Sequence, residues 1–560
     1  MGELRGRPDV HLGWGAFAPA ASGATSDRRG VHYSCPVGAA NPQSKVLTPP
    51  GREKPASGSG SPGATDRARG PGGAGGAAPR GARLLPQGWA IEAGVLLALA
   101  AFVAASAWLA ASAAAGRYAV DTSGAPVPGW VSGPLQGIAS PLTPDGFSVA
   151  LLVMLVTFLA VLAASRFVAP AYAIGAIVTA HIALALAPPL LSADVFGYIA
   201  FGRLGTVDGL NPYLSSISAA PHDPILPYIF WRHARTPYGP LFTLLTYPLV
   251  SLGPKGMLWA LKGLAAAASL GIVALVWRGA AQRGRSPVRA ALFVGLNPVT
   301  IVYAVGGAHN DLIMTLLITA VVVVLGTERG FGPVTGPLWQ AARPAPATYR
   351  RPRRRDTGGW ATMFSGRRRP DRRAGPHPLA AGAVAALAIA VKLPAALLAP
   401  YLLTATRRWR SVLLGLALAA LVMAGVTLLA FGAHPGKMIS ATFDQRPAQF
   451  SGPYWLARLL STPEDSALKT GCIVAAGVLA VIALAVAWWR RRQADVWIAC
   501  AGWAFLGAVL AVPSFEPWYV VWILPLAALA TGRSLRVAAL VLTVAVIAIH
   551  LPVLGFVPAL

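Results

Sequence analysis

Charged residues are scarce in this sequence, since Lys, Arg, Asp and Glu make up only 12% of its 560 residues. Soluble domains carry about 25%, so the composition excludes an ordinary cytosolic globular protein. Cys35, Cys472 and Cys500 are too few and too scattered for a disulfide framework or a thiolate metal site. The sequence also has no convincing Walker loop, GxGxxG fingerprint, nucleophile elbow or βαβ pattern. An enzyme that holds a nucleotide in a Rossmann-type domain is therefore excluded.

Hydrophobic residues are abundant, at 55% of the chain, and the mean hydropathy is +0.57. Long apolar runs alternate with short polar segments, which is the pattern of an all-α polytopic membrane protein. These runs predict about thirteen spans, at 88–112, 146–164, 170–190, 256–277, 289–304, 312–326, 379–391, 394–405, 410–431, 467–489, 496–512, 518–531 and 535–551.

Two polar regions contribute to the net charge of +27. Residues 1–87 are rich in Gly, Pro and Ser, and we expect a disordered basic cytoplasmic tail without a signal peptide. Residues 327–377 include YRRPRRRD (349–356) and GRRRPDRR (366–373). We interpret this second region as a basic cytoplasmic loop, with anionic-lipid or nucleic-acid contact as the less favoured alternative. We expect no nucleic-acid partner.

The positive-inside rule orients the predicted spans. With the tail inside, the basic clusters at 278–289, 407–410, 490–492 and 533–536 are also inside. The apolar stretch 237–253 must then lie in the interface rather than cross, and the C-terminus is outside. The segments that face outward together are 192–255, 306–311, 432–466 and 513–519, with the KLP hinge (392–394) at the outer end of a short helical pair.

Asp194 is the first candidate residue in these outward segments, within SADVFGYIAFGR (192–203). A carboxylate at a helix end near the headgroups can act as a general base or bind a hard divalent cation. The structural alternative is a helix N-cap formed by Ser192 or Asp194. Downstream, GLNPY (209–213), which includes Asn211, is typical of a turn.

The segment WRHARTPYGP (231–240) places Arg232, His233 and Arg235 beside Tyr238 on the outer side. Positive charge outside opposes the usual bias and indicates a local anionic partner, such as a phosphate at the membrane surface. Contact with ordinary lipid headgroups is the alternative.

The turn GGAHND (306–311) follows a predicted span and offers His309, Asn310 and Asp311. A His and an Asp two residues apart can orient a sugar, bind a metal or move a proton, although two ligands make an incomplete metal site. Capping of the next helix by Asn310 or Asp311 is the structural alternative.

Lys392 interrupts the apolar run 381–403. An ionisable residue within a span costs about 2.5–3.5 kcal/mol on insertion scales and usually faces a cavity or a partner. Because Pro394 breaks the helix there, the ammonium can meet a buried anion such as a lipid phosphate, or snorkel to the interface.

Glu516 lies among aromatic rings in PSFEPWYVVW (513–522), two residues before Trp518. An aromatic belt at the interface is the default interpretation of these rings. Aromatic rings beside a carboxylate are also typical of a sugar site. Asp444 and Arg446 are weaker candidates of the same kind.

Six short motifs occur in one order: DVFGY (194–198), GLNPY (209–213), TPYGPL (236–241), NPVTIVYAVGGAHNDLIM (297–314), AVKLPA (390–395) and PWYVVW (517–522). Together they resemble the actinobacterial polyprenyl-phosphate-mannose-dependent alpha-(1→6)-mannosyltransferases of the GT-C class. The resemblance covers roughly residues 145–550 and leaves out the tail and the basic loop.

The resemblance implies a GT-C-like bundle in the plasma membrane with an extracytoplasmic active site. It implies mannose transfer from polyprenyl-phosphate-mannose to a cell-envelope glycolipid or lipoglycan, with an alpha-(1→6) linkage and inversion. By this carry-over Asp194 is the catalytic base. Contacts to substrate are expected from Tyr198, Asn211, Tyr238, His309, Asn310, Asp311, Glu516 and Trp518. Contacts to phosphate are expected from Arg232, Arg235 and Lys392.

Three alternatives stay open. A transporter or flippase for a polyprenyl-linked lipid usually shows repeated halves and ionisable residues near the midplane, and we see no repeat here. A GT-C transferase of another sugar, such as arabinofuranose or glucose, is the alternative within enzymes, and a scaffold docked through its basic loop is the third. The cofactor is open as well: Val195 follows Asp194 where a second Asp would favour Mg²⁺ or Mn²⁺.

Overall fold

The computed structural model of this protein describes residues 87–116, 129–326, 377–436, 451–462, 466–493 and 495–551. These residues all belong to one compact unit. The predicted tail up to residue 86, the basic loop 327–376, and the candidates Asp444 and Arg446 lie outside the described residues.

The described part of the chain contains helices and no β-strand, which confirms the all-α prediction. The α-helices are α1 (Gln87–Ala114), α2 (Gly129–Ser132), α3 (Pro144–Ala163), α4 (Pro170–Leu186), α5 (Asp194–Thr206), α6 (Pro240–Thr246), α7 (Gly253–Gln282), α8 (Pro287–Gly295), α9 (Asp311–Gly326), α10 (His377–Val391), α11 (Ala399–Ala405), α12 (Trp409–Phe431), α14 (Gly452–Leu460), α15 (Ser466–Trp489), α16 (Val496–Ala511), α17 (Leu524–Leu529) and α18 (Ser534–Ile549). Shorter helical segments include η1 (Gly133–Leu135), η5 (Pro248–Leu252), the π-helix η6 (Val299–Val305), η10 (Leu393–Leu398) and η12 (Pro517–Trp522).

Five of the described helical runs are long and apolar enough to cross a membrane. They are Ala90–Ala114, Pro144–Ala163, Pro240–Gln282, Trp409–Phe431 and Ala467–Trp489. The α8–η6 pair, bent by 47°, adds a sixth if it counts as one span. A helix or helical pair occupies each of the thirteen predicted spans, but seven of these helices are shorter than the spanning length. The number of thirteen crossings stays a prediction.

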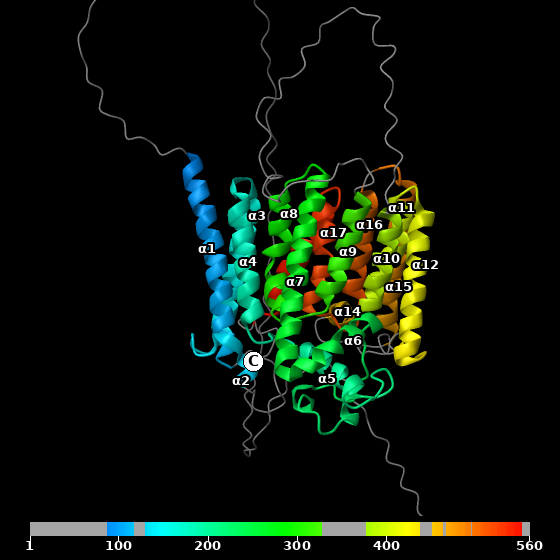
Figure 1. The fold of residues 1–560 in the computed structure, drawn as a ribbon. Coiled ribbons are helices and arrows are strands. Elements are labelled where there is room, and N and C mark those ends of the chain that lie inside the picture. Colours follow the sequence, from blue (N-terminus) through cyan, green and yellow to red (C-terminus); the bar gives the residue numbers. More distant parts are fainter. Residues whose placement is uncertain are drawn as a thin grey trace, which may run out of the picture. The chain divides into compact units, whose positions relative to one another are not determined.

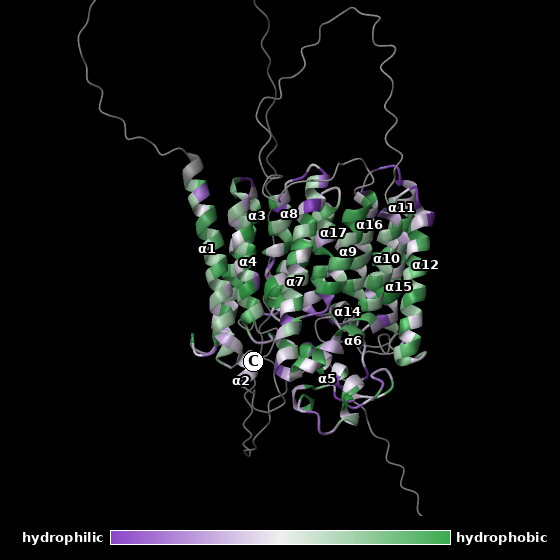
Figure 2. Cartoon of the chain, viewed as in Figure 1, coloured by the Kyte–Doolittle hydropathy of each residue, from purple (hydrophilic) through white to green (hydrophobic). Residues whose placement is uncertain are grey.

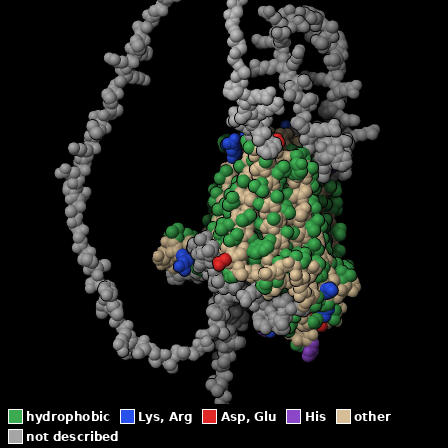
Figure 3. All heavy atoms as spheres, turned by 90° about the vertical axis from the view of Figure 1, so that its left-hand side faces the viewer, with side chains coloured by type: hydrophobic (Ala, Val, Ile, Leu, Met, Phe, Trp, Pro, Cys, Tyr) green, Lys and Arg blue, Asp and Glu red, His purple; other side chains and the backbone are tan. Residues whose placement is uncertain are grey.

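The long helices of the bundle lie side by side, while α2, α5 and α6 gather at one of its ends (Figure 1). Hydrophobic side chains cover most of their length, and hydrophilic residues are concentrated toward the two ends and the connecting loops (Figure 2). The face drawn in Figure 3 is hydrophobic over most of its middle, with the Lys and Arg side chains nearer its edges. This distribution is the one expected for a protein with an apolar belt in a bilayer.

Local sequence signals set several helix starts. Thr143 accepts a hydrogen bond from the N–H of Gly146 at 3.0 Å, and Pro144 opens α3. Ser286 caps α8 in the same way, with Pro287 as the first helical residue. A side-chain oxygen followed by Pro is a favoured helix start, because Pro lacks an N–H that would be unpaired there anyway.

The stretch 237–253, expected not to cross, contains the short helix α6. Its seven residues span about 10 Å, which is too short to cross a bilayer alone. The chain continues through η5 into α7, and the run Pro240–Gln282 counts as one candidate span. In Figure 1, α6 lies beside α5 at one end of the bundle.

Candidate active site

Asp194 is the first residue of α5 and is buried. Its carboxylate does not cap the helix, because the N-cap residue is Ala193 and the backbone N–H of Asp194 donates to Ser192 Oγ at 3.1 Å. Ser192 accepts this bond from outside the helix, and no side chain caps α5, so neither residue forms the N-cap that the sequence offered as the alternative. The Asp194 carboxylate is left to interact across the fold.

His309 is the partner of Asp194. Its Nδ1 lies 3.2 Å from Asp194 Oδ2, within ion-pair distance, yet neither ring nitrogen has hydrogen-bond geometry to any group. The ring is fully buried and stacks on the indole of Trp518, with centroids 3.6 Å apart and planes inclined by 14°. The site thus holds an imidazole in a fixed plane against a carboxylate, with nitrogen atoms still unpaired.

Two tyrosines form a wall beside this pair. Tyr198, on the buried face of α5, donates to Asn310 Oδ1 and accepts from the N–H of Asn310, both at 3.3 Å. Its ring packs edge-on against Tyr238 and Phe242, with centroids 4.8 Å apart in each case. Burial first, and then the nearby Asp194 carboxylate, raise the pKa of both tyrosines well above 10. Both phenols therefore stay protonated at neutral pH.

The fully buried Asp311 forms an ion pair with the half-buried Lys392. Lys392 Nζ lies 2.8 Å from both carboxylate oxygens of Asp311, and Trp522 Nε1 donates to Oδ1 at 2.7 Å. The ammonium also lies 5.1 Å from the ring centroid of Tyr519. The anion that Lys392 was expected to meet is therefore a carboxylate of the chain itself. Both carboxylate oxygens of Asp311 are engaged in this ion pair.

Glu516 precedes η12 in the link that follows α16. Burial, followed by the Asp194 carboxylate, raises the pKa of Glu516 well above 4.5, while Lys392 acts in the opposite direction. Asp194 and Lys392 therefore both act electrostatically on Glu516, which is half-buried. Trp518, two residues later, has an indole N–H that is buried and unpaired.

The backbone is constrained just before both central residues. Leu191 (φ 57°) and Ala308 (φ 59°) lie in the left-handed region that non-glycine residues rarely adopt. Such strain, costing about 1–3 kcal/mol, is concentrated at functional sites. The π-helix η6 leads into the same turn, and a Cβ on Gly307 would collide with the ring of His309.

Lys262 is a residue of this region that the sequence analysis did not single out. It lies fully buried in α7, and its Nζ donates to the carbonyls of Pro188 at 3.3 Å and Gly306 at 2.9 Å. The N–H of Leu190 also donates to Gly306 at 3.1 Å. Lys262 thereby joins the loop before Asp194 to the turn before His309. The pattern that indicated Lys392, a charged residue inside an apolar run, is also present at Lys262.

Three predicted site residues lie apart from these contacts. The amide of Asn211 donates to the carbonyl of Phe431 at 2.8 Å and accepts from the N–H of Tyr213, so it stabilises the predicted turn. Arg232 is half-buried and Arg235 is exposed. Within the described residues, neither guanidinium forms an ion pair or hydrogen bond with the cluster.

The cluster does not supply a complete ligand set for a metal ion. Across the part of the chain that the structure describes, no three His, Cys, Asp or Glu side chains have the spacing to hold one. Asp311 is already paired with Lys392. We therefore assign no step to a divalent cation.

Comparison with known proteins identifies the family. Residues 93–408, more than half of the chain, match the family described as alpha-(1→6)-mannopyranosyltransferase, N-terminal domain, and residues 452–553 match the MptB C-terminal domain. An alpha-(1→6)-mannopyranosyltransferase of Mycobacterium tuberculosis is 30% identical over 397 residues, which is 65% of this chain and 66% of the relative. Alpha-(1→6)-mannopyranosyltransferase A of the same organism is 26% identical over 62% of each chain.

A relative in Corynebacterium glutamicum, alpha-(1→6)-mannopyranosyltransferase B, is 29% identical over 164 residues, which is 28% of this chain and 27% of the relative. The chain thus spans less than two thirds of the length of these relatives. No solved structure matches it. On the match over residues 93–408, the chain belongs to the alpha-(1→6)-mannopyranosyltransferase family.

Proposed function

We propose that this protein is a membrane mannosyltransferase. It moves mannose from polyprenyl-phosphate-mannose to a glycolipid or lipoglycan acceptor of the cell envelope, and it forms an alpha-(1→6) linkage with inversion. Membership of the family and the printed names of its relatives support the choice of mannose and of linkage. The apolar helices support a donor delivered within the membrane.

The observation that carries the proposal is the environment of Asp194. Its buried carboxylate has no capping role, and it faces an imidazole whose two nitrogens are unpaired. Buried polar groups without partners are uncommon in native structures and cost about 1–3 kcal/mol each. A polar substrate that satisfies them explains why they are retained, and sugar hydroxyls have the matching donors and acceptors.

In the proposed reaction, Asp194 accepts the proton of the acceptor hydroxyl. The hydroxyl oxygen forms a bond to C1 of mannose as the bond from C1 to the phosphate oxygen breaks. The bonding electrons leave with the polyprenyl phosphate, and attack from the opposite face inverts the anomeric centre. General-base assistance of this kind contributes about 10²–10⁴-fold to a rate.

His309 and the tyrosine wall have supporting roles in this proposal. The stacked His309 presents Nδ1 toward the Asp194 carboxylate, 3.2 Å away, and offers Nε2 to the sugar. Tyr198 and Tyr238 remain protonated donors because their pKa values are raised. The third N–H of Lys392, beyond the two that bind Asp311, and the outer Arg232 and Arg235 are the candidates for the leaving phosphate.

Orientation is part of the proposal. The helices α5 and α6 lie at one end of the bundle (Figure 1). The C-terminal end of α12 binds Asn211 through Phe431, whereas the basic residues Arg407 and Arg408 precede the other end of this helix. By the positive-inside rule we infer an extracytoplasmic site and a cytoplasmic N-terminal end of α1.

The test supplies labelled polyprenyl-phosphate-mannose or labelled GDP-mannose to washed membranes that contain the protein. We expect a mannosylated lipid product from the lipid donor alone, and its release by an alpha-(1→6)-specific mannosidase. Transfer from a different polyprenyl-linked sugar, with none from the mannose donor, would overturn the choice of sugar. Movement of the lipid across vesicles without product would favour a transporter.

A further inference from the structure

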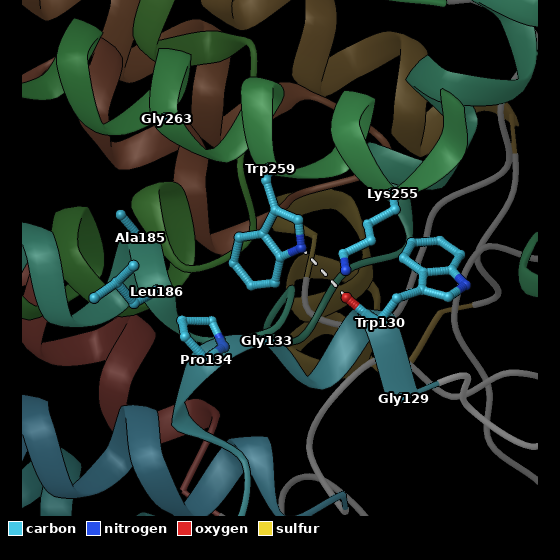
Figure 4. A pocket seen from close by; sticks show the side chains of 9 residues that line it. All are labelled: Gly129, Trp130, Gly133, Pro134, Ala185, Leu186, Lys255, Trp259 and Gly263. Carbon is cyan, nitrogen blue, oxygen red and sulfur yellow. Dashed lines mark hydrogen bonds between the residues drawn. The ribbon is translucent and has the colours of Figure 1, made fainter. Parts of the chain in front are cut away.

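A cavity of about 590 Å³ lies apart from the Asp194 cluster, between α2, η1, the end of α4 and the start of α7 (Figure 4). Two indoles, Trp130 and Trp259, stand on either side of the Lys255 side chain, and Leu186 and Pro134 add apolar walls. The helix α2, which supplies Gly129 and Trp130 to the lining, lies at the same end of the bundle as α5 (Figure 1).

The walls of the cavity are held in place. Trp259 Nε1 donates to the carbonyl of Trp130 at 3.3 Å, which fixes the plane of the indole. Gly133 has φ 73°, and a Cβ there would collide with the Trp259 ring, so the backbone of η1 packs directly on the indole. Gly263 opens the opposite side, because a Cβ at this position would meet nothing within 4 Å.

Lys255 gives the cavity its charge. The side chain is exposed, and among the described residues no carboxylate lies within ion-pair distance of it. Figure 4 shows it reaching from the first turn of α7 toward the two indoles. A cation between indoles at the end of a membrane helix can bind one anionic group beside an apolar surface.

Two elements that line the cavity, α4 and α7, also lead to the proposed active site. Lys255, Trp259 and Lys262 are four and seven residues apart, so they share one face of α7. Lys262 binds the carbonyl of Pro188, two residues beyond the cavity residue Leu186. The chain from Leu186 reaches Asp194 eight residues later.

We infer that this cavity binds the phosphate end of a polyprenyl phosphate lipid, a second lipid subsite next to the catalytic loop. The ammonium of Lys255 binds the phosphate, and the first isoprene units lie against Trp259 and Leu186. This occupant matches both the single unpaired cation and the apolar walls. The inference rests on the proposed function for the choice of lipid, but not on Asp194 acting as the base.

The test uses a photoreactive polyprenyl phosphate with the intact protein in lipid nanodiscs, and maps the cross-linked peptides by mass spectrometry. We expect labelling of peptides 129–135 and 255–263. Gly263→Leu fills the open side and Lys255→Gln removes the cation, so each should lower the labelling of these peptides about tenfold. Gly175→Leu is the matched control, since Gly175 on α4 also faces open space and is not part of the cavity.

Competition with unlabelled compounds distinguishes polyprenyl phosphate from other sources of a phosphate group. Unlabelled polyprenyl phosphate should abolish labelling, whereas inorganic phosphate, uncharged polyprenol and phosphatidylglycerol at the same concentration should not. Equal competition by any of these three, or labelling unchanged in both variants, would overturn the inference. Because labelling requires no turnover, specific labelling without mannose transfer would leave this site standing and remove the proposed function. Mannose transfer without labelling of this cavity would leave the proposed function standing and overturn this site.

Discussion

At the scale of single residues, the site depends on ionisable side chains whose partners lie far away in sequence. Asp194 meets His309, and Lys392 meets Asp311, each across the interior of the bundle. Lys262 meets no carboxylate and binds two backbone carbonyls instead. Charges in apolar surroundings are costly, so each of these residues is expected to contribute to activity more than to stability.

Lys262→Met tests this expectation at the buried lysine. The substitution removes a buried charge and keeps the apolar part of the side chain, so the melting temperature in detergent should stay equal or rise. The two loops lose their common donor, and kcat should fall about 10²-fold, the size of effect seen for small misplacements of reacting groups. Lys262→Arg, which keeps donors for the carbonyls, should recover part of this loss. A fall in melting temperature that matches the loss of kcat would indicate a purely structural role.

Glu516 predicts a dependence of stability on pH. Its pKa in the fold is raised above 4.5, chiefly by burial. The stability associated with this carboxyl is therefore complete below about pH 4.5 and is lost as the pH rises through the folded value. We expect the melting temperature of the wild type to fall as the pH rises above about 4.5, and that of Glu516→Gln to fall less. Identical slopes of melting temperature against pH in the wild type and in Glu516→Gln would contradict the raised pKa of Glu516. Asp145→Asn, at an exposed position, is the control.

At the scale of elements, short irregular segments build the site, and the long helices hold them. The start of α5, the turn between η6 and α9, the hinge between α10 and η10, and η12 each supply cluster residues. Close packing fixes the supporting helices: Gly382 of α10 and Gly415 of α12 lie against backbone atoms of the opposite helix. Small residues at such contacts let membrane helices approach closely.

Gly307→Ala tests the turn that carries His309. The new Cβ has no room beside the His309 ring and the carbonyl of Tyr303, so the ring must move off Trp518. We expect mannose transfer to fall about 10²-fold, measured at equal amounts of folded protein. Gly175→Ala on α4 adds the same methyl group in open space and should keep full activity. Full activity in Gly307→Ala would show that the stacked ring is not required.

At the scale of the whole molecule, much of the helical arrangement could be predicted from sequence, because apolar runs bounded by charges define membrane helices. Asp194, His309, Asp311 and Lys392 stood out as polar residues beside such runs. Their pairing was not predictable, since Lys392 and Asp311 are 81 residues apart and the expected anion was a phosphate. Trp522 was missed as a site residue for the same reason, because its partner Asp311 comes from packing. Lys262 was missed although it interrupts an apolar run, as Lys392 does.

The proposed orientation predicts which ends of the bundle a membrane-impermeant maleimide reaches in intact cells. With Cys35, Cys472 and Cys500 replaced by Ser, a cysteine at the exposed position of Arg235 should be labelled from outside. A cysteine at the exposed position of Arg408 should be labelled only after the membrane is opened. The opposite pattern would reverse the orientation and place the cluster on the cytoplasmic side.

The most direct test of the whole account is mannose transfer by Asp194→Asn. This substitution keeps the size of the side chain and removes its basicity, while Asp145→Asn makes the same change at an exposed position on α3. At equal expression in membranes supplied with polyprenyl-phosphate-mannose, Asp194→Asn should lose about 10²–10⁴-fold in rate and Asp145→Asn should match the wild type. Wild-type rates in Asp194→Asn would contradict its role as the base.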